Sequence, residues 1–166
     1  MDITFIQLHK ILQTAFEWQE YHLFDFMVFD HAAMWYDDTV AVLVGSEDDL
    51  YFRSNTRLMG GVAISEYLPR YRHLIYNYDY GDDWTHRIEV TGVLDNCTTA
   101  HPFCVSGSGN APPEDVGGSP GFENFLDITA DPTHDEHAFT MAWGKAQQYR
   151  SFDIAAINRA LEHVLF

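Results

Sequence analysis

The side chains with the greatest chemical capacity lie in two stretches of the chain. The first stretch runs from Tyr78 to His86 and reads Tyr-Asp-Tyr-Gly-Asp-Asp-Trp-Thr-His, and the second is a Gly- and Pro-rich run over 107–118. Together they carry five carboxylates and one imidazole, on Asp79, Asp82, Asp83, His86, Glu114 and Asp115. Oxygen ligands with one imidazole suit Mg, Mn or Zn. We therefore predict that the two stretches form one acidic site and that these six residues are candidate ligands of a divalent metal ion.

Asp79 and His86 are also candidate catalytic residues. If Asp82 and Asp83 are the tip of a hairpin, Asp79 lies opposite His86, with Cβ atoms roughly 5 Å apart. Asp79 could then orient His86 as a general base. The alternative is structural, because turn aspartates commonly hydrogen-bond the backbone around the tip. Glu114 and Asp115 could likewise cap nearby amides, so both interpretations stay open.

A second candidate metal site consists of Cys97, His101 and Cys104, all within one loop. Zinc needs a fourth ligand, and the usual paired-cysteine spacing is absent, so free or buried thiols are the favoured interpretation. The glycines at 107 and 109 lack the lysine of a phosphate-binding loop, and there is no Ser-centred nucleophile elbow. Trp84 could act as a lid or a stacking platform, although core packing is favoured.

Composition and charge restrict the class of partner. The 166 residues include 25 acidic and 9 basic ones, a formal net charge of −16, with 46% hydrophobic and 15% aromatic residues. Such a chain can bury a core as one domain, and its surface repels phosphates and anionic lipid. We expect Arg70, Arg72 and Arg87 to pair with carboxylates rather than to bind nucleic acid. Without a membrane-length apolar run or a signal-peptide pattern, a soluble, cytoplasmic protein with a protein or small-molecule partner is expected.

The first half of the chain has one helical pattern and several strand patterns. A helix is predicted over 2–18, where Thr4 and Gln7 have the spacing of a capping box. Alternating or apolar runs predict strands over 21–30, 40–44, 72–80 and 85–94. Loop is expected over 51–61 and a short helix over 65–71.

The second half begins with a long connection over 96–120, whose length favours a functional role. The pattern is helical after it. Ser119 is predicted to cap a helix with Pro120 in its first turn, and Thr133 with Glu136 to form a capping box for a helix ending at Gly144. Asp153 is predicted to cap the last helix. The order of elements predicts an α+β fold in which an N-terminal helix packs on a small, mostly antiparallel sheet, followed by C-terminal helices.

These motifs resemble the plasmid pRiA4b ORF-3-like family, also described as TnpR passenger proteins of an insertion element. The resemblance rests on Leu8-His9, Trp18, His22-Leu23, the hairpin motif over 78–86, and Pro112 to Gly118 followed by Gly121-Phe122. Asn158 matches a late Asn in the closing helix. The resemblance covers nearly the whole chain as a single domain over 1–166. It implies an α+β fold and no established activity.

Two departures from the family pattern bear on the interpretation. Tyr80 stands where the family usually has Phe, and the chain starts at the helix without the β-hairpin that usually precedes it. Either the start has been truncated, or the sheet is smaller, or a partner supplies strands. Because an uncovered sheet edge invites pairing, homo-oligomerisation is one option. The favoured function is a non-catalytic accessory or binding protein, often carried on mobile elements, whose acidic aromatic cleft holds a partner peptide, small molecule or cation. The alternative is a metal-dependent hydrolase in which carboxylates hold the ion and His86 moves protons.

Overall fold

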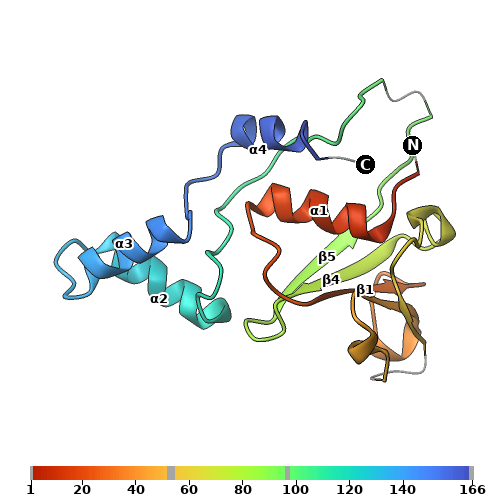
Figure 1. The fold of residues 1–166 in the computed structure, drawn as a ribbon, viewed down its shortest axis with the longest axis horizontal. Helices are drawn as coiled ribbons and strands as arrows, with labels where there is room; N and C mark the ends of the chain where they lie inside the picture. Colours follow the sequence, from red (N-terminus) through yellow and green to blue (C-terminus); the bar gives the residue numbers. More distant parts are fainter. Residues whose placement is uncertain (1, 52–54, 96–97, 165–166) are drawn as a thin grey trace. The chain divides into compact units, whose positions relative to one another are not determined.

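The computed structural model describes residues 2–51, 55–95 and 98–164 and has the predicted α+β architecture (Figure 1). The chain forms two compact units. The sheet unit contains Met1–Ile11 and Tyr21–Ala100, and the helical unit contains Leu12–Glu20 and His101–Leu165. Helix α1 (Phe5–Phe16) therefore contributes residues to both units, and the chain passes between them at residues 11–12, 20–21 and 100–101.

The sheet unit is built on one five-stranded mixed sheet in the order β3-β2-β1-β4-β5. The strands are β1 (Phe24–Phe29), β2 (Thr39–Val44), β3 (Thr56–Leu58), β4 (His73–Tyr78) and β5 (Trp84–Glu89). All neighbours pair antiparallel except β2 and β3, which pair in parallel. The 3-10 helices are η1 (Tyr36–Asp38), η2 (Glu47–Tyr51) and η3 (Ile64–Glu66).

The sequence prediction differed from the structure at β3. Residues 56–58 were expected to be loop, but they form the edge strand on β2. Three residues are too few to show the alternation that identifies a strand. The helix expected over 65–71 is only the single 3-10 turn η3.

One face of the sheet carries the aromatic core. Phe26 of β1 and Tyr76 of β4 are fully buried there, and their rings stack 4.9 Å apart. The start of α1 packs on this face, because the Phe5 ring meets the Phe26 ring edge-on at 5.3 Å and the His9 ring stacks on Phe24 at 3.5 Å. His9 also hydrogen-bonds the Tyr76 hydroxyl at 2.8 Å, so this buried imidazole has a polar partner. Aromatic stacking and burial therefore attach α1 to the sheet.

The beginning of α1 confirms the predicted capping box. The Thr4 amide donates to Gln7 Oε1 at 2.7 Å, and the Gln7 amide donates to Thr4 Oγ1 at 3.2 Å. These two bonds satisfy amides that have no partner within the helix itself. The helix ends at Phe16, two residues before the predicted end at Trp18.

The helical unit contains α2 (Gly118–Ala130), α3 (His137–Ala146) and α4 (Ile154–Leu161). Phe125 of α2 is its aromatic centre, with edge-on contacts to Trp143 at 5.8 Å and Tyr149 at 4.8 Å. Asp153 caps α4 as predicted, because its Oδ1 accepts from the amides of residues 155 and 156. The packing positions of α4 are Ile157 and Leu161, which are buried.

Two other predicted caps are wrong. Gly117, with a φ of +94°, is the N-cap of α2, so Ser119 lies inside the first turn of the helix beside Pro120. The Thr133–Glu136 capping box does not form, because Asp131 Oδ1 accepts from both the amide and the hydroxyl of Thr133. Helix α3 begins later, at His137, and ends at Ala146 rather than at Gly144.

Candidate functional site

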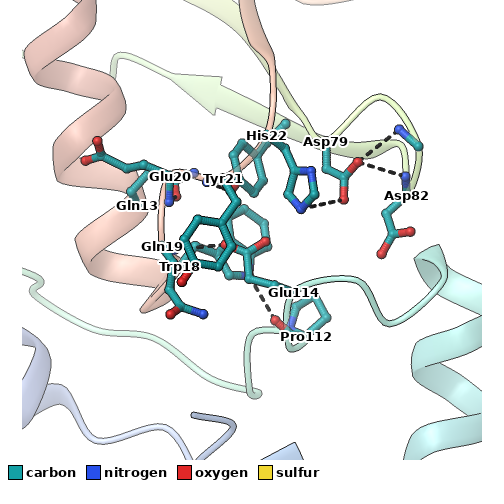
Figure 2. Close-up of polar contacts among 12 residues, drawn as sticks. Gln13, Trp18, Gln19, Glu20, Tyr21, His22, Asp79, Asp82, Pro112 and Glu114 are labelled. Atoms are coloured by element: carbon teal, nitrogen blue, oxygen red, sulfur yellow. Dashed lines mark hydrogen bonds and ion pairs between the residues drawn. The ribbon is translucent and has the colours of Figure 1, made fainter. Parts of the chain in front are cut away.

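The turn between β4 and β5 is organised by Asp79. Its Oδ1 accepts from the amides of Gly81 at 3.0 Å and Asp82 at 3.3 Å (Figure 2). Its carbonyl accepts from the Asp83 amide at 2.7 Å. Asp79 and Asp83 have φ values of +55° and +57°, a conformation that Asp and Asn tolerate better than most residues. The Asp79 carboxylate is buried, at 6% exposure, and so holds the turn together from inside.

This turn changes the register that the sequence predicted. The pairs across β4 and β5 are Tyr78–Trp84, Asn77–Thr85 and Tyr76–His86. His86 therefore lies opposite Tyr76, and the predicted pairing of His86 with Asp79 is wrong. Residues 79–83 form a five-residue connection in which Asp79 and Asp83 adopt left-handed conformations, whereas a hairpin with Asp82 and Asp83 as its tip was expected.

His22 is the imidazole that faces Asp79. Its Nε2 lies 3.5 Å from Asp79 Oδ2, within ion-pair range but longer than a strong hydrogen bond (Figure 2). The His22 ring meets the Tyr78 ring edge-on at 5.8 Å, and the Tyr21 amide donates to the Tyr78 hydroxyl at 3.1 Å. Residues 21 and 22 thus hold the end of β4. In the sequence, His22 belonged only to the strand predicted over 21–30, and its one signal was the His22-Leu23 motif of the family resemblance.

His86 is a partly buried residue on the core face of β5. Its Nδ1 lies 3.3 Å from the Tyr76 carbonyl oxygen. Burial lowers the pKa of His86, and hydrogen bonds with the backbone of Tyr76 and Trp84 oppose that shift in part. The imidazole is therefore neutral at neutral pH, the form that binds metals or accepts a proton.

The second predicted stretch is held by the segment that follows α1. The Trp18 indole donates to the Pro112 carbonyl at 2.9 Å, and the Gln19 amide donates to Glu114 Oε1 at 2.8 Å (Figure 2). Glu114 is 3% exposed, so its carboxylate is buried together with the amide that it accepts from. The neighbouring Asp115 is exposed and has a φ of +58°. Residues 18 and 19 thus fix the position of the Pro-Pro-Glu-Asp run.

The six predicted ligands fall into two groups, one in each unit. Asp79, Asp82 and Asp83 share the turn of the sheet unit, with His86 on the strand that follows it. Glu114 and Asp115 are adjacent in the helical unit. That the two groups meet in one site stays a prediction, and so do the metal and catalytic roles.

The cysteine-containing candidate is only partly within the described residues, because Cys97 lies outside them. Cys104 Sγ donates to the Ser106 carbonyl at 3.4 Å, and its backbone is held by Asn158. His101 Nδ1 lies 3.3 Å from the carbonyl of Pro102. A zinc site there stays a prediction.

Comparison with known proteins identifies the family. The sequence profile of the plasmid pRiA4b ORF-3-like protein family matches residues 1–161, and the chain belongs to this family. It is 29% identical over 158 residues to the uncharacterized protein y4hQ of Sinorhizobium fredii, covering 94% of this chain and 76% of that protein. Its fold resembles the crystal structure of MM3350, a protein of unknown function from Methanosarcina mazei, with a TM-score of 0.73 and 25% identity over 93% of this chain and 83% of that one. Among the described residues, no helix is both long and apolar enough to cross a membrane.

Proposed function

We propose that the protein is a non-catalytic accessory protein that binds a cation, small molecule or peptide at an acidic site formed by the 78–86 hairpin and the 107–118 loop. The observation that carries this proposal is that both loops are anchored to one short segment of chain. Trp18 and Gln19 bind the loop at Pro112 and Glu114, while Tyr21 and His22 bind the end of β4 at Tyr78 and Asp79.

Covalent continuity supports a shared site. Gln19 and His22 are separated by three peptide bonds, so their Cα atoms can be at most roughly 11 Å apart in any arrangement of the chain. Two loops attached to points this close on one segment can present their side chains to one ligand. Asp83, whose amide donates to the Asp79 carbonyl, and Asp115, the neighbour of Glu114, are both exposed. These are the carboxylates that we expect to meet the ligand.

The contacts of the buried acids favour binding over catalysis. Asp79 Oδ1 is used by two turn amides, and Glu114 Oε1 is used by the Gln19 amide. A carboxylate that stabilises backbone amides is poorly placed to change partners during a reaction cycle. His86 lies opposite Tyr76 and not opposite Asp79, so the Asp79–His86 pairing expected from the sequence does not form.

Metal analysis and thermal shift test the proposal. The extensively dialysed full chain is analysed for bound metal and then titrated with Mg²⁺, Mn²⁺, Ca²⁺ and Zn²⁺ one at a time. We expect at least one of these ions to raise the Tm, because a ligand that binds only the folded state stabilises it. Asp83→Asn and Asp115→Asn should each abolish the shift, whereas Asp48→Asn and Glu162→Gln, which change exposed acids elsewhere, should not.

Convergence of the loops is tested independently of any ligand. Spin labels at residues 83 and 115, in a chain whose two native cysteines are replaced by serine, report the distance between the loops by pulsed electron resonance. A short, narrow distribution supports one site. Two results together would overturn the proposal. One is a long or broad distance distribution, and the other is that no ion gives a Tm shift that is lost in Asp83→Asn and Asp115→Asn but kept in the two control variants.

The metal-dependent hydrolase is kept as a second candidate because the lowered pKa of His86 leaves a neutral imidazole at neutral pH. If it is correct, a simple phosphate ester or acetate ester is hydrolysed in the presence of the stabilising ion. His86→Gln should then abolish turnover without abolishing metal binding by the carboxylates. Equal rates for the wild type and this variant would exclude the hydrolase.

A further inference from the structure

The face of the sheet opposite the aromatic core carries a pocket of about 530 Å³, which lies wholly within the sheet unit. Successive strand residues point to opposite faces, so the residues that alternate with Phe26, Leu43 and Tyr76 line this second face. The pocket is the size of the cavities that hold small organic ligands. It contains no residue of the 107–118 loop and shares only Tyr80, Asp83 and Thr85 with the 78–86 hairpin, so the part of the pocket at Asp49 and Thr56 is distinct from the proposed acidic site.

The floor of the pocket is apolar. It is formed by Met27 of β1, Val42 and Val44 of β2, and Ile75 of β4. Met27 and the two valines are at most 5% exposed, and they belong to one hydrophobic cluster with Phe29. An apolar floor suits the hydrocarbon part of a ligand and provides no oxygen ligands for a hydrated metal ion.

The wall of the pocket contains buried acceptors that lack donors. Asp49 and Thr56 line the pocket, and one side-chain oxygen of each, Asp49 Oδ2 and Thr56 Oγ1, is buried beneath the pocket surface with no hydrogen-bond partner among the described residues. A buried carboxylate oxygen without a donor costs free energy, and such groups are rare in native proteins. Rotation of these short side chains towards the pocket would let a positively charged N–H donor of a ligand remove this cost.

A second carboxylate on the wall is held in a fixed orientation. Asn77 Nδ2 donates to Asp25 Oδ1 at 2.8 Å, and the Tyr80 hydroxyl donates to Asp25 Oδ2 at 3.1 Å. Thr85 Oγ1 in turn donates to Asn77 Oδ1 at 3.1 Å, so three strands and the turn contribute to one network. A site whose polar groups are already oriented needs little reorganisation when a ligand binds.

The charge and the aromatic residues of the lining indicate the class of ligand. Three aspartates line the pocket, and the described lining contains no lysine, arginine or histidine; the acids are Asp25, Asp49 and Asp83. Tyr36 and Tyr80 add two aromatic rings, 65% and 45% exposed, whose faces attract cations. We propose that this pocket binds an organic cation with a primary ammonium group and an apolar body, with the ammonium at Asp49 and Thr56 and the hydrocarbon on the Met27–Val42–Val44–Ile75 floor.

Probes with hydrocarbon parts of similar size test whether binding to the wild-type full chain requires a positive charge and an N–H donor. Calorimetric titration compares 2-phenylethylamine and hexylamine with 2-phenylethanol, hexanol and hexanoate, and with hexyltrimethylammonium, which is cationic but has no N–H. We expect the primary amines to bind at least tenfold more tightly than the alcohols and the quaternary ion, and hexanoate not to bind. Equal affinity of amine and alcohol would overturn the proposal, and so would an absence of amine binding.

Variants locate the bound amine. Asp49→Asn keeps the shape of the side chain and removes its charge, and we expect it to weaken amine binding at least tenfold. Asp48→Asn makes the same change at the exposed neighbour in the same 3-10 helix and should leave binding unchanged. Glu114→Gln should also leave amine binding unchanged. The proposal for the pocket and the proposal for the two-loop site can therefore be refuted independently. Equal losses in Asp49→Asn and Asp48→Asn would show that amines bind only through the general negative charge, which would overturn the assigned site.

Discussion

Asn158 holds the backbone of Cys104, 54 residues away, through both ends of its side-chain amide. The Cys104 amide donates to Asn158 Oδ1 at 2.6 Å, and Asn158 Nδ2 donates to the Cys104 carbonyl at 3.0 Å. The pair ties α4 to the long connection over 90–117, in which the described residues form no helix or strand. Asparagine suits this role because it can donate and accept at the same time.

Replacing Asn158 by alanine should therefore destabilise the helical unit. Two backbone groups of a half-buried segment would lose their partners, at a cost of about 1–3 kcal/mol in the free energy of unfolding. Urea denaturation monitored by Trp fluorescence measures the change. Arg159→Ala, at the exposed next position of the same helix, is the control and should change stability by no more than about 0.5 kcal/mol. Equal stability of the two variants would contradict the clamp.

Asp79 should be important for the turn through its shape more than through its charge. Asn keeps the Oδ1 acceptor and tolerates a φ of +55°, so Asp79→Asn should cost less than about 1 kcal/mol. Ala loses both bonds to Gly81 and Asp82 and is strained at that φ, so Asp79→Ala should cost about 2 kcal/mol or more. Thermal unfolding of the two variants side by side gives the comparison. Equal destabilisation by Asn and Ala would mean that the charge facing His22 dominates instead.

How far the sequence predicted the structure depended on the range of each interaction. The Thr4–Gln7 box and the Asp153 cap were predicted because both partners lie within three residues of each other. The alternation over 72–80 likewise predicted the strand β4, in which Leu74, Tyr76 and Tyr78 are buried. Such local patterns can be recognised from the spacing of residues in the sequence alone.

The parts that could not be predicted depend on competing or distant partners. The Asp131 side chain accepts a hydrogen bond from the Thr133 amide, so this amide is not available to the Glu136 side chain and the predicted capping box does not form. The β4–β5 register depends on two left-handed aspartates that no spacing rule reveals. At the candidate site, Trp18 contacts Pro112, 94 residues away in the sequence, and His22 contacts Asp79, 57 residues away. Such long-range contacts arise only from the fold. The sequence therefore indicated which residue types the candidate site contains, but it did not predict which residues they contact.

His9 should make stability depend on pH in the acid range. Burial, reinforced by the charge of Lys10, lowers the pKa of His9 from 6.5 to about 4. Between these values the unfolded chain binds a proton that the folded chain excludes, so stability is lost as the pH falls from 6.5 towards 4. The contribution is on the order of 3 kcal/mol. His9→Gln can still hydrogen-bond Tyr76 but cannot titrate, so its unfolding free energy should vary less over this range than that of the wild type. Parallel pH profiles of the two proteins would contradict the assignment.

Gly121 should tolerate no side chain, because the backbone of the 112–118 motif passes directly beside it. A Cβ atom at Gly121 would collide with the Val116 carbonyl oxygen and lie 2.8 Å from the carbonyl carbon, and backbone cannot rotate away as a side chain can. Gly121→Ala should therefore cost about 3 kcal/mol or more, or displace the loop that carries Glu114 and Asp115. Gly60→Ala is the matched control, since nothing lies within 4 Å of its Cβ position. Urea denaturation gives the cost, and spectral changes of the Trp18 indole, which donates to Pro112, report displacement of the loop. If Gly121→Ala matched Gly60→Ala in both measurements, the close approach of α2 to the loop would be refuted.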